Sequence, residues 1–260
     1  MTDPADPRRL LRDGVLDPDL LALLWILLEA RTPVVVVGPL PAAAERVVDD
    51  LVPLLPAQAA IVEIRPDDDF GAVPGADRLG WRTGDLPSAG GGHSPGPVAD
   101  PAPTAAGVLR VRGLATAGGV AGERARVVVR ALAIGYGLLA TMPGERLEDA
   151  LEALHDPTVG TDADERSRLG VVLVLDAGRT TSRVVAAHYV RPVAVDPGGH
   201  IHRQAPAVLG TWNEVRRAWD DFAWGVVPEL AGRLGIRPID LEREQARRAA
   251  LLRGGGATGG

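Results

Sequence analysis

The stretch Val34-Val35-Val36-Val37-Gly38-Pro39-Leu40-Pro41 decides the fold class of this chain. Four consecutive valines that end at a glycine are typical of a strand covered on both faces of a parallel sheet. Residues 42–55 then have helical composition, and residues 60–64 are a second short apolar run typical of a strand. A strand, a tight loop, a helix and a second strand make a βαβ unit, which predicts an α/β fold with a mostly parallel sheet flanked by helices.

The segments on either side of this unit predict more of the same architecture. Before it, Asp17-Pro18-Asp19 followed by the apolar residues 20–31 predicts a capped, buried helix. After it, the remaining periodic segments predict helices at about 123–134, at 145–154 and from Thr211 onward, and strands at 138–141, 171–175 and 182–195.

The domain organisation follows from where this periodicity stops. Residues 85–104 are rich in glycine and proline, which is typical of a flexible loop. We expect one domain over residues 15–252, with a disordered N-terminal tail over 1–14 and a disordered, glycine-rich C-terminal tail over 253–260.

The composition excludes several classes of function. The net charge is -6, there is no cysteine, and all 28 basic residues are arginine. Disulfides, thiolate metal sites and any mechanism that needs a lysine are therefore excluded, and a nucleic-acid partner is not expected. The longest apolar run, residues 20–28, is too short to span a membrane, and the N-terminus lacks the pattern of a signal peptide. We expect a cytoplasmic protein that does not insert into the membrane.

The valine strand also carries a resemblance to a known family. Glu29-Ala30-Arg31, the strand itself and Gly38-Pro39 resemble the approach of type II/IV secretion (pilus-assembly) ATPases to their phosphate loop. In that family the loop ends in Gly-Lys-Ser/Thr. Here the same positions hold Ala43, Ala44 and Glu45, so that the glycine, the lysine and the hydroxyl are all replaced.

Other landmarks of the family follow in order. Residues 118–122 resemble its second ATP motif, with Gly119 and Ala121 where the family has glutamate and arginine. Residues 133–143 resemble its histidine-containing segment, with Tyr136 and Pro143 in place of the two histidines. The resemblance covers residues 17–252, the motor domain of the family, and implies a RecA-like P-loop fold with a degenerate Walker A loop.

The replacements remove the chemistry that the family depends on. A phosphate loop needs backbone N–H groups at a helix N-terminus, a lysine on the phosphates and a hydroxyl on Mg²⁺. Pro41 has no N–H group, Ala44 no charge and Glu45 the wrong charge. We interpret Glu45 as the anion that stabilises the N-terminus of its own helix. No catalytic residue, metal site or bound cofactor is expected, whereas intact relatives bind ATP and Mg²⁺.

Aromatic residues predict a surface for a partner protein. Trp212, Val215, Trp219 and Phe222 stand at i, i+3, i+7 and i+10, which places them on one face of the helix expected here. Such a stripe is either core packing or a docking face, and aromatic residues are only 3% of the chain. Trp212, Trp219 and Phe222 are the candidate partner-binding residues.

Three functions remain open at this point. The first is a pseudoenzyme, a non-catalytic ATPase-like component or regulator of a type II/IV secretion or pilus-assembly machine. Its partners would be an intact secretion ATPase or a membrane platform protein at the inner face of the cell membrane. The second is a working ATPase of that machine, which the missing lysine disfavours. The third is an unrelated α/β interaction domain.

Overall fold

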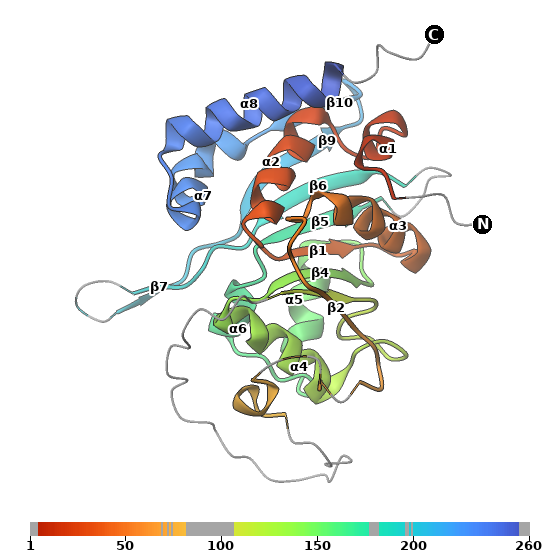
Figure 1. Ribbon diagram of the computed structural model, residues 1–260, viewed down its shortest axis with the longest axis vertical. Helices are drawn as coiled ribbons and strands as arrows, with labels where there is room; N and C mark the ends of the chain where they lie inside the picture. Colours follow the sequence, from red (N-terminus) through yellow and green to blue (C-terminus); the bar gives the residue numbers. More distant parts are fainter. Residues whose placement is uncertain are drawn as a thin grey trace.

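An eight-stranded sheet forms the centre of the protein in a computed structural model, which describes residues 5–68, 70–71, 73, 75–81, 107–176, 182–195, 198 and 200–254 (Figure 1). The strands follow the order β10-β9-β6-β5-β1-β4-β3-β2. Their bounds are β1 (Val34–Val37), β2 (Ile61–Ile64), β3 (Val108–Val111), β4 (Gly137–Met142), β5 (Val171–Leu175), β6 (Val184–Tyr189), β9 (Ala207–Asn213) and β10 (Ala218–Asp221). A separate two-stranded ribbon pairs β7 (Ala194–Val195) with β8 (Ile201–His202).

The valine strand β1 lies in the parallel half of this sheet. Strands β2, β3, β4, β1 and β5 run parallel to one another, and Val34 lies opposite both Leu139 of β4 and Val171 of β5. Strands β6, β9 and β10 extend the sheet in antiparallel order. All four valines of β1 are fully buried, as a strand covered on both faces requires. The predicted α/β fold with a mostly parallel sheet is confirmed.

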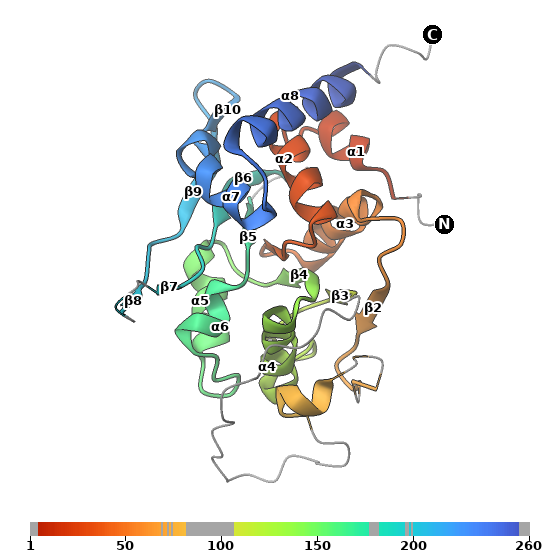
Figure 2. The ribbon, with the colours of Figure 1, turned by 60° about the vertical axis from the view of Figure 1, so that its left-hand side comes forward.

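Helices cover the two faces of the sheet, and β1 contributes to both cores. Val34 and Val36 belong to one apolar cluster, while Val35 and Val37 belong to the other, because successive strand residues point to opposite faces. Figure 2 shows the two groups of helices in the upper and lower halves of the view. The first group is α1 (Pro7–Arg12), α2 (Pro18–Glu29), α3 (Pro41–Leu51), α7 (Val227–Leu234) and α8 (Pro238–Gly254); the second is α4 (Gly122–Ala131), α5 (Leu147–His155) and α6 (Ala163–Ser167).

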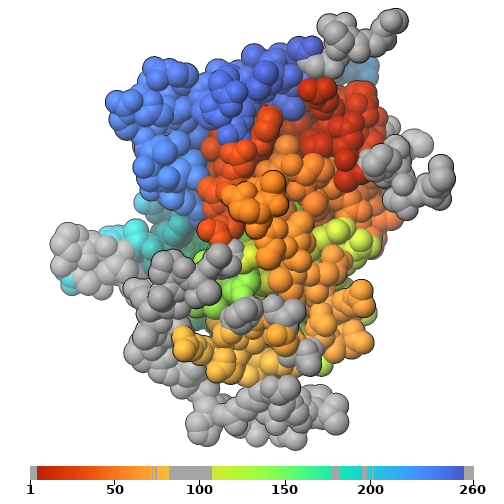
Figure 3. Space-filling view, viewed as in Figure 1, coloured from red at the N-terminus to blue at the C-terminus, as the bar shows by residue number. Residues whose placement is uncertain are grey.

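Helix α2 connects the N-terminal and C-terminal parts of the fold by packing. The side chain of Asp17 accepts a hydrogen bond from the backbone N–H of Leu20, so that the predicted cap is present. The helix packs along α8, which places the C-terminal segment directly against the N-terminal helices (Figure 3). Arg248 of α8 bonds Glu29 at 2.6 Å and stacks on Trp25, 4.7 Å from the ring centroid. None of the described helices is both long and apolar enough to cross a bilayer.

Several parts of the chain differ from the sequence prediction, and strand β3 was not predicted. The tail predicted over 1–14 is wrong at residues 7–12, which form α1. Its Arg9 makes two bonds, of 2.5 and 2.9 Å, to the buried carboxylate of Asp50. The helix predicted from Thr211 is wrong up to residue 221, which lies in a β-hairpin. The flexible loop predicted over 85–104 lies outside the described residues.

Candidate functional site

The carboxyl ends of β1, β3 and β4 form the edge of the sheet where α/β proteins usually bind ligands. Three turns meet there through the last residues of β4. Gly38 donates its N–H to the carbonyl of Met142 at 3.0 Å, and Gly113 donates to the hydroxyl of Thr141 at 2.9 Å. Of the residues singled out in the sequence, Gly38, Gly119 and Pro143 belong to these turns.

Tyr136 does not belong to this edge. It directly precedes β4, whereas Pro143 directly follows it, so the six residues of the strand separate them. Burial raises the pKa of the Tyr136 phenol and keeps the side chain neutral. Tyr136 packs in an apolar cluster at the start of β4.

The loop after β1 is too short and too occupied to curl around a phosphate. Helix α3 already begins at Pro41, which leaves only Gly38–Leu40 as loop. The N–H groups of Ala43 and Ala44 both donate to the carbonyl of Leu40, at 3.1 and 3.2 Å. The N–H of Gly38 is also used, and Pro39 and Pro41 have none. Five of the eight positions 38–45 therefore have no amide to offer an anion.

The side chains of Ala44 and Glu45, at the family's lysine and hydroxyl positions, make contacts other than those of a phosphate loop. Ala44 is 1% exposed and belongs to the apolar core between α3 and the sheet. Glu45 lies beyond the first turn of α3, which has no acidic side chain, and pairs with Arg112 of the β3–α4 turn at 3.3 Å. The interpretation of Glu45 as the anion of its own helix N-terminus is therefore wrong. The ion pairs continue across α3, β3 and β2 through Glu63, Arg110 and Asp49.

The second motif forms a closed turn with no space for a carboxylate. Val120 donates its N–H to the carbonyl of Gly113 at 2.9 Å, so that residues 113–120 fold back on themselves. A Cβ atom on Gly119 would lie 2.0 Å from the carbonyl oxygen of Gly113. Ala121 is the N-cap residue of α4 and makes no side-chain capping bond. Glycine at position 119 is thus a steric requirement of this turn.

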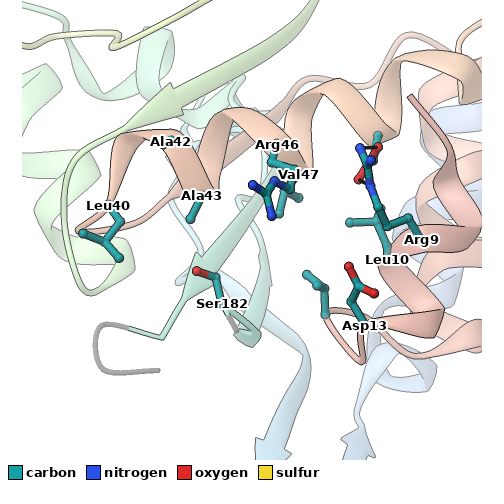
Figure 4. A pocket seen from close by; sticks show the side chains of 11 residues that line it. Arg9, Leu10, Asp13, Leu40, Ala42, Ala43, Arg46, Val47 and Ser182 are labelled. Carbon is teal, nitrogen blue, oxygen red and sulfur yellow. Dashed lines mark hydrogen bonds and ion pairs between the residues drawn. The ribbon is translucent and has the colours of Figure 1, made fainter. Parts of the chain in front are cut away.

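A cavity of about 330 Å³ opens on the other side of the loop after β1 (Figure 4). It lies between α1, α3 and Ser182, which precedes β6. The lining residues are Arg9, Leu10, Asp13, Val15, Leu40, Ala42, Ala43, Arg46, Val47, Asp50 and Ser182. Of these residues, sequence reasoning singled out only Ala43, because the lining comes from three segments far apart in the chain.

The charges that line the cavity differ in how they are partnered. Arg9 and Asp50 are bonded to each other, and Asp50 also accepts the backbone N–H of Asp6. By contrast, the side chains of Arg46 and Asp13 make no hydrogen bond or ion pair within the described part of the chain. In Figure 4 the guanidinium of Arg46 extends from α3 toward Ser182, and Asp13 lies at the end of α1. The cavity thus presents one cation and one anion that are available to a ligand.

The aromatic residues form a cross-strand pair. Trp212 and Trp219 lie directly opposite each other in the β9–β10 hairpin. The guanidinium of Arg183 stacks 3.8 Å from the ring centroid of Trp212, and Trp219 packs on the apolar core. Phe222, however, is 42% exposed, and Trp224, in the 3₁₀ turn Ala223–Val226, is 73% exposed. Sequence reasoning missed Trp224 because it does not fit the helical spacing.

Neither metal-binding clusters nor similarity to known proteins assigns a role to the described residues. Among the described residues, no cluster of three or more histidine, aspartate or glutamate side chains is arranged to hold a metal ion. No protein-family model matches the chain, and no curated protein is significantly similar to it in sequence. The roles of the residues at these sites follow from their geometry and from the motifs described above.

Proposed function

We propose that this protein is a non-catalytic, RecA-like relative of the type II/IV secretion ATPases, and that it acts through protein contacts in a secretion or pilus-assembly machine. The observation that carries the proposal is the start of α3 at Pro41, which turns the phosphate-loop position into a closed helix end. The strand order β5-β1-β4-β3-β2 is compatible with the RecA-like part of the proposal, because it differs from the Rossmann and flavodoxin orders.

The residues at this edge do not fit a Mg²⁺-bound triphosphate. Five of the eight loop positions have no amide to offer, the lysine position is a buried alanine and the second motif excludes a carboxylate. The loss of the cation alone forfeits about 4 kcal/mol for a phosphate about 4 Å away at an effective dielectric constant of about 20. The proposal therefore assigns this chain neither ATP binding nor hydrolysis.

Titration with a fluorescent ATP analogue in the presence of Mg²⁺ tests this directly. We expect no saturable binding below about 1 mM and phosphate release equal to that of a buffer blank. An intact secretion ATPase in the same assay is the positive control. Binding in the micromolar range together with turnover would overturn the proposal and favour a working ATPase.

The surface that we assign to a partner is the exposed pair Phe222 and Trp224. These side chains leave large aromatic area uncovered, and aromatic anchors dominate the energetics of protein interfaces. The partner in this proposal is an intact secretion ATPase or a membrane platform protein, at the inner face of the membrane. We leave Trp212 and Trp219 out of this surface, because both are half-buried and are partly covered by Arg183 and by the apolar core.

Trp224→Asp is expected to weaken co-purification with such a partner by about 30-fold or more, the usual effect of removing an aromatic anchor. Its thermal unfolding is expected to be unchanged, because the side chain is largely exposed. Val215→Asp, a change at an almost fully exposed residue of the hairpin, is the matched control. Equal binding by Trp224→Asp and Val215→Asp would contradict the assignment of this surface.

A further inference from the structure

We propose that the cavity between α1 and α3 binds a small zwitterion with an apolar body, about the size of a hydrophobic dipeptide. Its carboxylate would pair with Arg46 and accept a hydrogen bond from the hydroxyl of Ser182, and its ammonium group would pair with Asp13. This site shares Leu40, Ala42 and Ala43 with the phosphate-loop positions, but its charged residues lie outside them, and the inference does not rest on the proposed function.

The charges of the lining determine the charge of the ligand. Two arginines and two aspartates line the cavity, so its net charge is zero. Arg9 and Asp50 neutralise each other through two hydrogen bonds, which leaves Arg46 and Asp13 for the ligand. A polyanion such as a triphosphate would gain one cation but would also meet the carboxylate of Asp13. A ligand with one charge of each sign satisfies both side chains.

The remaining lining is apolar and determines the body of the ligand. Leu10, Val15 and Val47 are buried and form the inner wall. Leu40 lies in the loop after β1 and is 52% exposed, although it is a large apolar side chain. A ligand in the cavity would cover part of Leu40 and gain about 25 cal/mol for each Å² of apolar surface removed from water.

The size of the cavity limits the ligand further. A volume of about 330 Å³ lies at the lower end of the range for small-molecule sites. It accommodates a dipeptide such as leucyl-leucine, whereas a folded partner would cover the mouth only. The guanidinium of Arg46 suits a carboxylate in particular, because its planar fork of N–H donors matches the two oxygens.

The test combines three ligands with three protein variants. The ligands are leucyl-leucine, N-acetyl-leucyl-leucine, which lacks the ammonium group, and leucyl-leucinamide, which lacks the carboxylate. The variants are Arg46→Gln, Asp13→Asn and the matched control Arg233→Gln, which changes an exposed arginine on α7 that does not line the cavity. Binding is measured by NMR titration, and circular dichroism with thermal unfolding verifies that each variant is folded.

We expect leucyl-leucine to bind the natural chain with a Kd of about 1 mM or below, and each blocked analogue to bind at least about fivefold more weakly. Arg46→Gln is expected to weaken leucyl-leucine by the same factor while leaving leucyl-leucinamide unchanged. Asp13→Asn is expected to weaken the binding of leucyl-leucine by the same factor but to leave the binding of the N-acetyl analogue unchanged. The control Arg233→Gln is expected to bind like the natural chain.

Three results would overturn the proposal. The first is the absence of binding by leucyl-leucine and by a panel of other apolar dipeptides up to about 10 mM, which corresponds to a binding free energy near -2.7 kcal/mol. The second is binding that Arg46→Gln and Asp13→Asn leave unchanged in folded protein. The third is that Arg46→Gln and Asp13→Asn each weaken the binding of all three ligands by the same factor. That result would show that the charged groups do not recognise the ends of the ligand.

Discussion

Ala44→Lys, which restores the lysine of the phosphate loop, is expected to lower the free energy of unfolding by about 3 kcal/mol or more. The side chain at position 44 is 1% exposed and packs between α3 and the sheet, so the new ammonium group would be buried without a partner. For a chain of this size, this corresponds to a decrease in Tm of about 6–12 °C. Urea unfolding and calorimetry measure both quantities.

The matched control for this change is Ala42→Lys, two residues earlier in the same helix. Ala42 is exposed, so the new lysine would remain in solvent. Its cost is expected to be about 0.3–1 kcal/mol, because a cation is unfavourable near a helix N-terminus. An Ala44→Lys variant that is as stable as Ala42→Lys and also binds ATP would show that the loop opens before α3 begins, and would contradict the proposed function.

Gly119→Glu, which restores the carboxylate of the second motif, is expected to destabilise the protein by about 3 kcal/mol or more. Gly119→Ala should cost nearly as much, because the Cβ atom alone would lie 2.0 Å from the carbonyl oxygen of Gly113. Relief of this contact requires the turn to open, which breaks the hydrogen bond from the N–H of Val120 to the carbonyl of Gly113. Thermal unfolding of both variants measures the effect.

The neighbouring Gly118 provides the control. Its φ is +86°, which favours glycine, yet a Cβ atom there would have no neighbour within 4 Å. Gly118→Ala is therefore expected to cost only the strain of a left-handed backbone, about 1–2 kcal/mol. If Gly118→Ala proves more destabilising than Gly119→Ala, backbone conformation rather than the contact with Gly113 governs this turn, and the second motif has room for a side chain.

The two changes share an expected consequence under the proposed function. Each places a residue typical of the proposed family at a position that supports packing, in one case between α3 and the sheet and in the other within a turn. We therefore expect single restorations to reduce stability without producing ATP turnover. Phosphate release by either variant, measured at a temperature where it is folded, would contradict this expectation.

The sequence by itself determined most of the parallel half of the fold, although it did not predict β3. The valine run of β1 and the capped helix α2 depend on residues close together in the chain, and the structure places both where they were predicted. Local spacing was misleading in the tail, where Trp212 and Trp219 have helical spacing but face each other across a hairpin. The turn between them is stabilised by Asn213, whose side chain accepts hydrogen bonds from the N–H groups of Val215 and Arg216.

Only the tertiary structure decided what the replaced residues do. The start of α3 at Pro41 determines which face Ala44 presents, and that face is buried by a sheet whose strands are spread along the chain. The cavity brings Arg9, Arg46 and Ser182 together from segments far apart in sequence. Periodicity reports which side of one element is apolar, but it contains no information about the element that packs against it. For that reason the fold class was predictable from the sequence, whereas the cavity and the requirement for glycine at position 119 were not.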